Sequence, residues 1–380
     1  MTAQHSFLPP SGANTWSKCA LWPTMNREFP QDSNTVESVE GTAAHDTAWM
    51  ILRGEIPSPG ATSANGSIVT EEMIEGGDLI TETIKQRTAG MELHIEEKVD
   101  CVLVNPHCWG TPDVWGISKD FTRIEIFDYK FGHRFVDEFW NAQGLLYLAG
   151  ILDFIQNHFR ITPSQLEPVT TVSFTVVQPR CFHRGDPVRT HAYRLADTRD
   201  RFNHLANMAE MSMTDKPSAT TNDHCGDCPG RHACSALQLA AYDAAEHSNA
   251  RTPIMLSPTA AALELKLLMR ALARLEARVD GLKEQTIANI RAGKPVPYFR
   301  AEPGYGRQQW SKPDSQIVAM GKMFGVDLAK PGVITPKQAE KVGVSADIVK
   351  TFSFVPSTGF KLVEDKSTDA AKTFAELREI

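Results

Sequence analysis

The spacing of apolar residues along the chain changes between helical and strand periodicity several times. Helical spacing predicts helices over residues 36–53 and 71–90, and alternation predicts antiparallel strands over 91–104 and 121–130, with a turn at 111–120. Helical spacing returns over 135–159, a strand ended by Pro179 is predicted over 170–180, and a helix over 194–213. This order predicts an α/β core in which helices pack on a mixed sheet.

The flanking segments predict how the chain divides. Residues 1–35 carry four prolines and predict a mostly irregular arm, and residues 54–67 predict a loop. A loose stretch at 246–258 precedes a long predicted helix at 258–293. Because 380 residues exceed one ordinary core, we expect two domains, residues 1–250 and a small α+β domain of residues 251–380.

Composition narrows the class of protein. Hydrophobic residues make up 42% and charged residues 22%, as in globular proteins, and the longest apolar run is interrupted by Asp153. We therefore expect no membrane span, and the N-terminus predicts no signal peptide. Seven cysteines fit a reducing cytoplasm better than a secreted disulfide framework. The net charge of −7 argues against non-specific coating of nucleic acid, but not against a nuclease.

The strand over 121–130 contains the tripeptide Asp128-Tyr129-Lys130. Residues two apart on a strand share a face, so Asp128 and Lys130 are expected to project together. A carboxylate that binds a divalent ion beside an ammonium group suits phosphodiester hydrolysis. Alone, this pattern is more often a solvated strand face.

Asp113 lies 15 residues earlier, where a loop enters a strand. A hairpin of this length can bring it beside Asp128, and two close carboxylates repel unless a cation such as Mg²⁺ or Mn²⁺ lies between them. The alternative is a turn-capping aspartate.

Two predicted helices carry further candidates. Gly41 and His45 share a face of the first helix, so the missing side chain at Gly41 would let the helix approach the sheet with His45 toward the carboxylates. Gln143 and Tyr147 share a face of the helix that follows the Asp-Tyr-Lys strand. Taken singly, each pair is more often structural than functional.

Together these residues resemble the RecB-like branch of the PD-(D/E)XK nuclease superfamily, which carries G-x-x-x-H, Asp, D-x-K and Q-x-x-x-Y in this order. The resemblance implies a restriction-endonuclease-like core. It implies metal ligation by His45, Asp113, Asp128 and the Tyr129 carbonyl, and a catalytic set of Asp113, Asp128, Lys130, Gln143 and Tyr147. In that set Gln143 and Tyr147 would hold the DNA backbone.

Cysteines form a second constellation, with Cys19 near the start and Cys225, Cys228 and Cys234 in C-x2-C-x5-C. CRISPR-associated RecB-like nucleases and AddB-type helicase–nucleases bind a [4Fe–4S] cluster through one upstream and three downstream cysteines. The resemblance therefore implies a structural cluster that clips the arm to residues 225–234. Zinc accepts the same four ligands and is the alternative.

The layout is also similar to a phage-encoded family with a RecB-like nuclease domain. It implies an Mg²⁺- or Mn²⁺-dependent DNA exonuclease of the host-cell cytoplasm that processes ends for recombination, with a phage single-strand annealing protein as a partner. The alternatives are a non-catalytic DNA-binding recombination scaffold and a zinc-stabilised interaction protein. On the long helix Arg270, Arg274 and Arg278 predict either a phosphate-tracking stripe or a solvated face.

Overall fold

A computed structural model describes residues 6–30, 35–181, 186–247, 256–306, 308–312, 314–329, 335–355 and 357–364. The chain divides into two compact units, Met1–Arg278 and Val279–Ile380. The predicted boundary segment 246–258 includes residues 248–255, which lie outside the described residues. Among the described helices none is long and apolar enough to cross a membrane.

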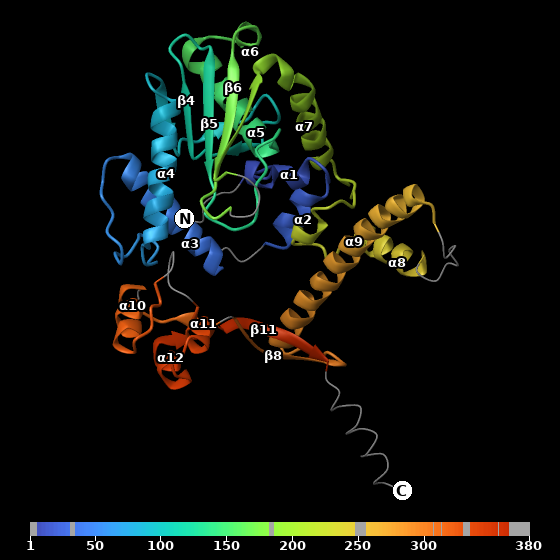
Figure 1. The fold of residues 1–380 in the computed structure, drawn as a ribbon. Helices are drawn as coiled ribbons and strands as arrows, with labels where there is room; N and C mark the ends of the chain where they lie inside the picture. The colour runs from blue at the N-terminus through green and yellow to red at the C-terminus, as the bar shows by residue number, and fades with distance from the viewer. Residues whose placement is uncertain are drawn as a thin grey trace. The chain divides into compact units, whose positions relative to one another are not determined.

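The first unit is an α/β fold around a mixed five-stranded sheet (Figure 1). Its strands are β1 (Glu92–Ile95), β4 (Val114–Ile117), β5 (Arg123–Tyr129), β6 (Thr171–Val177) and β7 (Val188–Arg194), in the spatial order β1-β4-β5-β6-β7. Only the β5–β6 pair is parallel, because helix α5 (Ala142–Phe159) carries the chain from one strand to the other.

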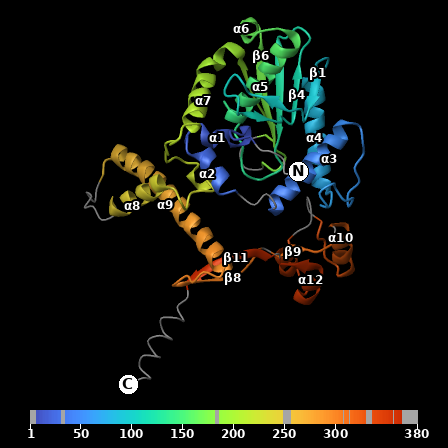
Figure 2. The same ribbon diagram turned by 180° about the vertical axis from the view of Figure 1, so that it is seen from behind.

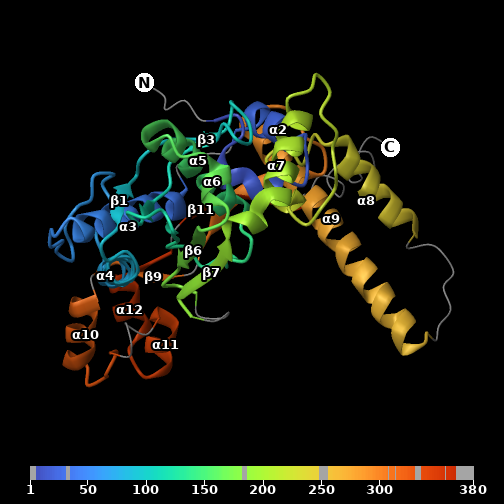
Figure 3. The ribbon, with the colours of Figure 1, turned by 90° about the horizontal axis from the view of Figure 1, so that it is seen from above.

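Helices cover both faces of this sheet. Helices α3 (Val36–Leu52) and α4 (Glu71–Arg87) pack on one face around Phe127 and Tyr129, and Figure 1 shows α4 running alongside β4. Helix α5 packs on the other face against Ile124 and Ile126, as seen from behind and from above (Figures 2 and 3). Alternate residues of β5 therefore enter two separate apolar clusters, as the alternation in the sequence predicts.

Two strand predictions need correction. Residues 111–120, predicted as a turn, contain β4, whose four residues are all buried and so show no alternation. Residues 91–104, predicted as one strand, form two short strands, β1 and β2 (Val99–Asp100), and β2 pairs with β3 (Trp109–Gly110) instead of joining the main sheet. The sequence analysis also missed β7, an edge strand.

The N-terminal arm is not irregular. It forms a 3₁₀ turn η1 (Pro10–Gly12) and helices α1 (Ala13–Trp16) and α2 (Trp22–Glu28). Leu8 and Trp16 are fully buried in the cluster that covers the α5 face of the sheet. The four prolines suggested an extended arm, yet Pro10 and Pro23 occupy first turns of helical segments, where proline is tolerated.

Glycines in α4 decide how closely this helix approaches the sheet and its neighbour α3. A Cβ at Gly76 would collide with the Tyr129 hydroxyl, and a Cβ at Gly77 would lie 3.1 Å from Ala48 Cα of α3. At Gly41 a Cβ would meet no atom within 4 Å. The expectation that Gly41 permits the approach of α3 was therefore wrong, and Gly76 and Gly77 serve that purpose.

These glycines give a paired prediction for stability. Gly76→Ala is expected to lower the free energy of unfolding by about 1–3 kcal/mol, because Tyr129 must shift in a packed core. Gly41→Ala is expected to raise it by roughly 0.5–1 kcal/mol, since alanine is the better helix former where space is free. Urea unfolding of the two variants measures both. A loss of stability in Gly41→Ala would contradict the packing described.

The remainder of the first unit continues from β7. The 3₁₀ turn η2 (Leu195–Thr198) leads into α7 (Arg199–Ser212), and η3 (Cys225–Asp227) and α8 (Ser235–His247) follow. Helix α6 (Pro163–Leu166) lies between α5 and β6.

Helix α9 (Pro258–Arg291) contributes residues to both units. Arg278 is not on a solvated face, because its guanidinium donates to the Arg231 and His232 carbonyls.

The second unit combines short strands with short helices. Strand β8 (Phe299–Tyr305) pairs with β11 (Ser357–Glu364), and β9 (Gln309–Trp310) pairs with β10 (Ser353–Phe354). Helices α10 (Asp314–Met323), α11 (Pro336–Lys341) and α12 (Ala346–Phe352) enclose a small core that contains Ile317, Leu328 and Val349.

Candidate functional site

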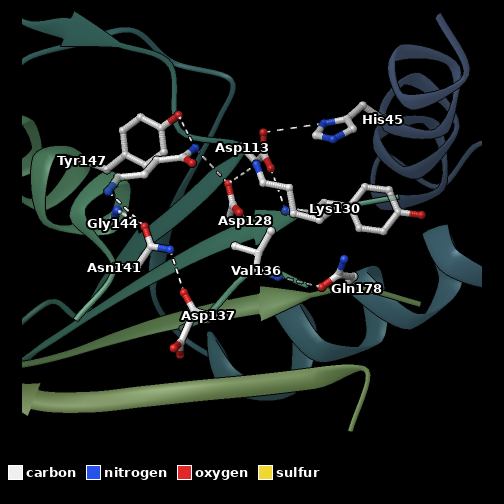
Figure 4. Close-up of polar contacts among 12 residues, drawn as sticks. His45, Asp113, Asp128, Lys130, Val136, Asp137, Asn141, Gly144, Tyr147 and Gln178 are labelled. Atoms are coloured by element: carbon white, nitrogen blue, oxygen red, sulfur yellow. Dashed lines mark hydrogen bonds and ion pairs between the residues drawn. The ribbon is translucent and has the colours of Figure 1, made fainter. Parts of the chain in front are cut away.

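The carboxyl end of β5 places Asp128 and Lys130 together, as their spacing predicts. Lys130 Nζ donates to Asp128 Oδ1 at 2.8 Å (Figure 4). Asp128 is only 1% exposed, and Tyr129 points to the opposite face between α3 and α4. Asp128 is therefore buried at a sheet end and Lys130 is partly exposed beside it, so the alternative of a fully solvated strand face does not apply.

Asp113 directly precedes β4 and lies beside Asp128. The antiparallel register pairs Val114 with Phe127, which brings the next two residues, Asp113 and Asp128, opposite each other. The Tyr129 backbone N–H donates to Asp113 Oδ2 at 2.7 Å and fixes this carboxylate. His45 of α3 reaches the other oxygen, with Nδ1 3.6 Å from Asp113 Oδ1 (Figure 4).

Helix α5 supplies the third side of the site. Gln143 Nε2 donates to Asp128 Oδ1 and to the Tyr147 hydroxyl, each at 3.0 Å. The Asn141 side chain caps α5 by accepting from the Gln143 and Gly144 amides, which fixes the first turn of the helix and so the position of Gln143 (Figure 4). Gln143 and Tyr147 are 8% and 6% exposed, Gln143 bonds to Asp128 and Tyr147 bonds to Gln143, so their contact with a DNA backbone stays a prediction.

The charges at this site depend on one another. Burial raises the pKa of the Asp128 carboxyl, with the Asp113 carboxylate adding to the rise and the Lys130 ammonium opposing it. Burial disfavours the charged form of Lys130, but the Asp128 and Asp113 carboxylates outweigh it and raise the pKa of the amine. Lys130 therefore stays a cation at neutral pH.

The donor set fits a divalent cation. Asp128 Oδ2 is buried and has no hydrogen-bond partner, which is costly for a carboxylate oxygen. Two acidic side chains and an imidazole, from Asp113, Asp128 and His45, offer the oxygen and nitrogen ligands that Mg²⁺ and Mn²⁺ accept. As their side chains now stand, no three His, Cys, Asp or Glu residues in the described part of the chain surround a common point for an ion.

The four singled-out cysteines line one small cavity. Cys19 comes from the turn after α1, and Cys225, Cys228 and Cys234 come from the segment around η3, more than 200 residues later. The cavity they share has a volume of about 30 Å³, and Trp22 and Met25 form part of its wall. Cys181, by contrast, does not line it.

The surroundings of these thiols fit a thiolate-bound cluster. Backbone N–H groups of Thr220 and Asn222 donate to the sulfurs of Cys19 and Cys225, at 3.4 and 3.3 Å. Burial raises the pKa of Cys225, and raises that of Cys228 to about 12, so a bound metal would have to displace their protons. Hydrogen bonds to sulfur and exclusion of water are the protein's means of tuning an iron–sulfur centre. Zinc remains compatible with the same four ligands.

Arg180 is a site-supporting residue that the sequence analysis missed. It follows β6 and donates bidentately to Glu40 of α3, at 2.8 and 2.9 Å, and to Glu72 of α4, at 2.7 and 3.0 Å. Its guanidinium lies 3.8 Å from the centre of the Phe131 ring. Arg180 thereby joins the helix that carries His45 to the strand end that carries Lys130. An arginine directly after Pro179 was visible in the sequence, but its two partners lie more than 100 residues away.

Arg180→Ala is expected to lower the free energy of unfolding by about 2 kcal/mol. The arginine is buried, so its removal leaves two carboxylates unpaired, although both are partly exposed and can regain water. Arg53→Ala, which removes an exposed pair with Glu55, is the matched control and should change stability by less than about 0.5 kcal/mol. Equal effects of the two substitutions in urea unfolding would refute the clamp.

A known protein family matches most of the chain. A family model described as "Protein of unknown function (DUF2800)" matches residues 5–353. The chain belongs to this family. The matched range includes the arm with Cys19, every residue of the carboxylate site, the three clustered cysteines and most of the second unit. The DUF2800 match thus extends over residues of both units, while its description assigns no activity.

Proposed function

We propose that the protein is a metal-dependent deoxyribonuclease of the exonuclease type. The observation that carries the proposal is the meeting of His45, Asp113, Asp128 and Lys130 at one end of the sheet, with a buried carboxylate oxygen that lacks a partner. These four residues come from three distant segments, and their order along the chain resembles that of RecB-like nucleases, which supports the proposal. This arrangement suits hydrolysis of a phosphodiester better than a purely structural role.

His45, Asp113 and Asp128 would hold Mg²⁺ or Mn²⁺, with the Tyr129 carbonyl as a further ligand. When bound, such an ion supplies Lewis acidity toward a phosphoryl oxygen and lowers the pKa of its water. The chain itself orients the ligands. The Tyr129 amide holds Asp113, and Gln143 holds Asp128.

Lys130 acts as a permanent cation in this proposal. Its raised pKa makes it a poor general base, and its ammonium lies beside Asp128 with 31% of the side chain exposed. It can therefore donate to a phosphate oxygen as negative charge develops there. Gln143, whose amide also bonds to the Tyr147 hydroxyl, keeps the Asp128 carboxylate in place from the helix side.

The four-cysteine cavity supports a structural [4Fe–4S] cluster as a second cofactor, with Zn²⁺ as the alternative. Either would tie the arm to residues 225–234. By the same resemblance, we place the enzyme in the cytoplasm of a phage-infected cell, with DNA ends as substrate and a phage single-strand annealing protein as partner.

The test is degradation of end-labelled duplex and single-stranded DNA with Mg²⁺ and with Mn²⁺. Release of mononucleotides or short products from linear DNA, with covalently closed circles left intact, is the expected result. Cleavage of the circles would identify an endonuclease instead. DNA binding without any metal-dependent release of nucleotides would support the non-catalytic recombination scaffold. The absence of both DNA binding and degradation would favour the zinc-stabilised interaction protein.

A further inference from the structure

A groove borders the carboxylate site through Lys130 and Gln143, which both contact it. It has a volume of about 1220 Å³, and its walls are arm residues 11–22, the segment from Lys130 to Leu145, and the start of α7. Lys130 and Gln143 form part of its lining. The groove is therefore large enough for a strand of nucleic acid that must reach Asp128.

An aromatic pair stands in this lining just before α5. Phe139 lines this groove and is 64% exposed, so its ring is accessible from the groove. Its neighbour Trp140 has φ of +47°, a left-handed conformation that is rare and strained for a bulky residue. Strain of this kind persists only where surrounding contacts hold it, and it is concentrated at functional sites.

The contacts around Phe139 and Trp140 leave the Phe139 ring exposed. The Arg201 guanidinium lies 3.7 Å from the Trp140 ring centre, and Tyr193 of β7 lies 4.6 Å from it, so the Trp140 ring is occupied. Phe139 contacts His191 at 4.6 Å, and most of its surface remains exposed. The turn is held by Asp137, which accepts from the Phe139 amide and from the Asn141 side chain (Figure 4).

The position of Phe139 relative to the carboxylates is restricted by the chain. Only four residues separate it from Gln143, whose Nε2 is 3.0 Å from Asp128 Oδ1. Four residues span at most about 14 Å. The Phe139 Cα is thus within about 14 Å of the Cα of Gln143, the residue that contacts Asp128.

The charged side chains of this groove would not by themselves attract a nucleic acid. Its four lysine and arginine side chains are matched by four aspartates, and Arg134 is paired with Asp227. Stacking on an aromatic ring is independent of net charge and tolerates any base. In a duplex the faces of interior bases are covered by their neighbours, so an isolated ring selects an unpaired base.

We infer that Phe139 is a stacking platform for an unpaired nucleobase of single-stranded DNA that lies in this groove. The inference rests on the proposed nuclease function and specifies its substrate as a single-stranded end. Trp140, held by Arg201 and Tyr193, fixes the orientation of the platform.

The experiment measures binding of fluorescein-labelled oligothymidylate to the full chain by anisotropy, in EDTA so that no DNA is degraded. Phe139→Ala is expected to weaken binding by about 5- to 100-fold, the range for loss of one stacked base. Phe139→Trp is expected to retain it. Phe159→Ala is the matched control, because this ring is 39% exposed at the far end of α5, away from Phe139, and it should bind like the wild type.

A second measurement separates stacking from misfolding. In a series of oligonucleotides, a single abasic site is placed at successive positions along the strand. At one position the missing base is expected to weaken binding to the wild type, but not to Phe139→Ala. Equal binding by the wild type and Phe139→Ala would overturn the inference. Metal-dependent degradation that does not depend on Phe139 would refute the platform and leave the nuclease intact. Binding through Phe139 without degradation would support the platform and refute the nuclease.

Discussion

Asp128→Asn is expected to lower metal-dependent DNA degradation by about 1,000-fold or more. Asparagine keeps the size of the side chain and an oxygen that can accept from Lys130 and Gln143, so the hydrogen bonds seen in the structure can persist. What it removes is the negative charge and the buried second oxygen, the two features that suit a cation. Release of acid-soluble nucleotides, with Mg²⁺ or Mn²⁺ varied, measures the effect.

A buried acid on the same strand provides the control. Glu125 is 2% exposed but forms ion pairs with Arg87 and Arg123, away from the site. Glu125→Gln is therefore expected to lower stability and leave the degradation rate of the folded protein unchanged. If Asp128→Asn and Glu125→Gln had the same activity as the wild type, another site would have to carry any nuclease activity.

Cys225→Ser is expected to remove the visible colour of anaerobically purified protein and to destabilise it by about 5 kcal/mol. A cross-link between residues 19 and 225 closes a loop of some 200 residues, and loops of that order contribute about 5 kcal/mol through the unfolded chain. Iron and sulfide analysis, together with thermal unfolding, measures the two effects.

Cys181→Ser supplies the matched control, since this thiol is buried but lies outside the four-cysteine cavity. It should retain iron and colour. Colourless wild-type protein with stoichiometric zinc would replace the cluster by a zinc site. Wild-type protein with neither metal would leave the four thiols as packing residues.

Much of the candidate site was predictable because it depends on local spacing. The two-residue period of a strand predicts that Asp128 and Lys130 share a face, and a hairpin brings Asp113 beside them; the structure has both. The helical four-residue period likewise predicts that Gln143 and Tyr147 touch.

What could not be predicted depends on contacts between distant segments. Gly41 and Gly76 look equivalent in a helical pattern, and only the neighbouring Tyr129 and Pro179 distinguish them. Arg180 finds Glu40 and Glu72 far upstream. Strand β4 is buried on both sides and therefore lacks the alternation that identifies a strand. The left-handed backbone at Trp140 is imposed by its surroundings rather than by its residue type.

The attachment of the N-terminal arm has a consequence for synthesis on the ribosome. The Ser17 backbone carbonyl accepts from His204 Nε2 at 3.0 Å, and the Leu21 amide donates to the Ser218 carbonyl, so the first helices are secured by residues made some 200 positions later. Domains generally fold as units while translation proceeds. Here α1 and α2 cannot complete these contacts until the ribosome has delivered α7 and the segment beyond it. Nascent chains truncated before residue 218 are therefore expected to be sensitive to proteolysis at their beginning.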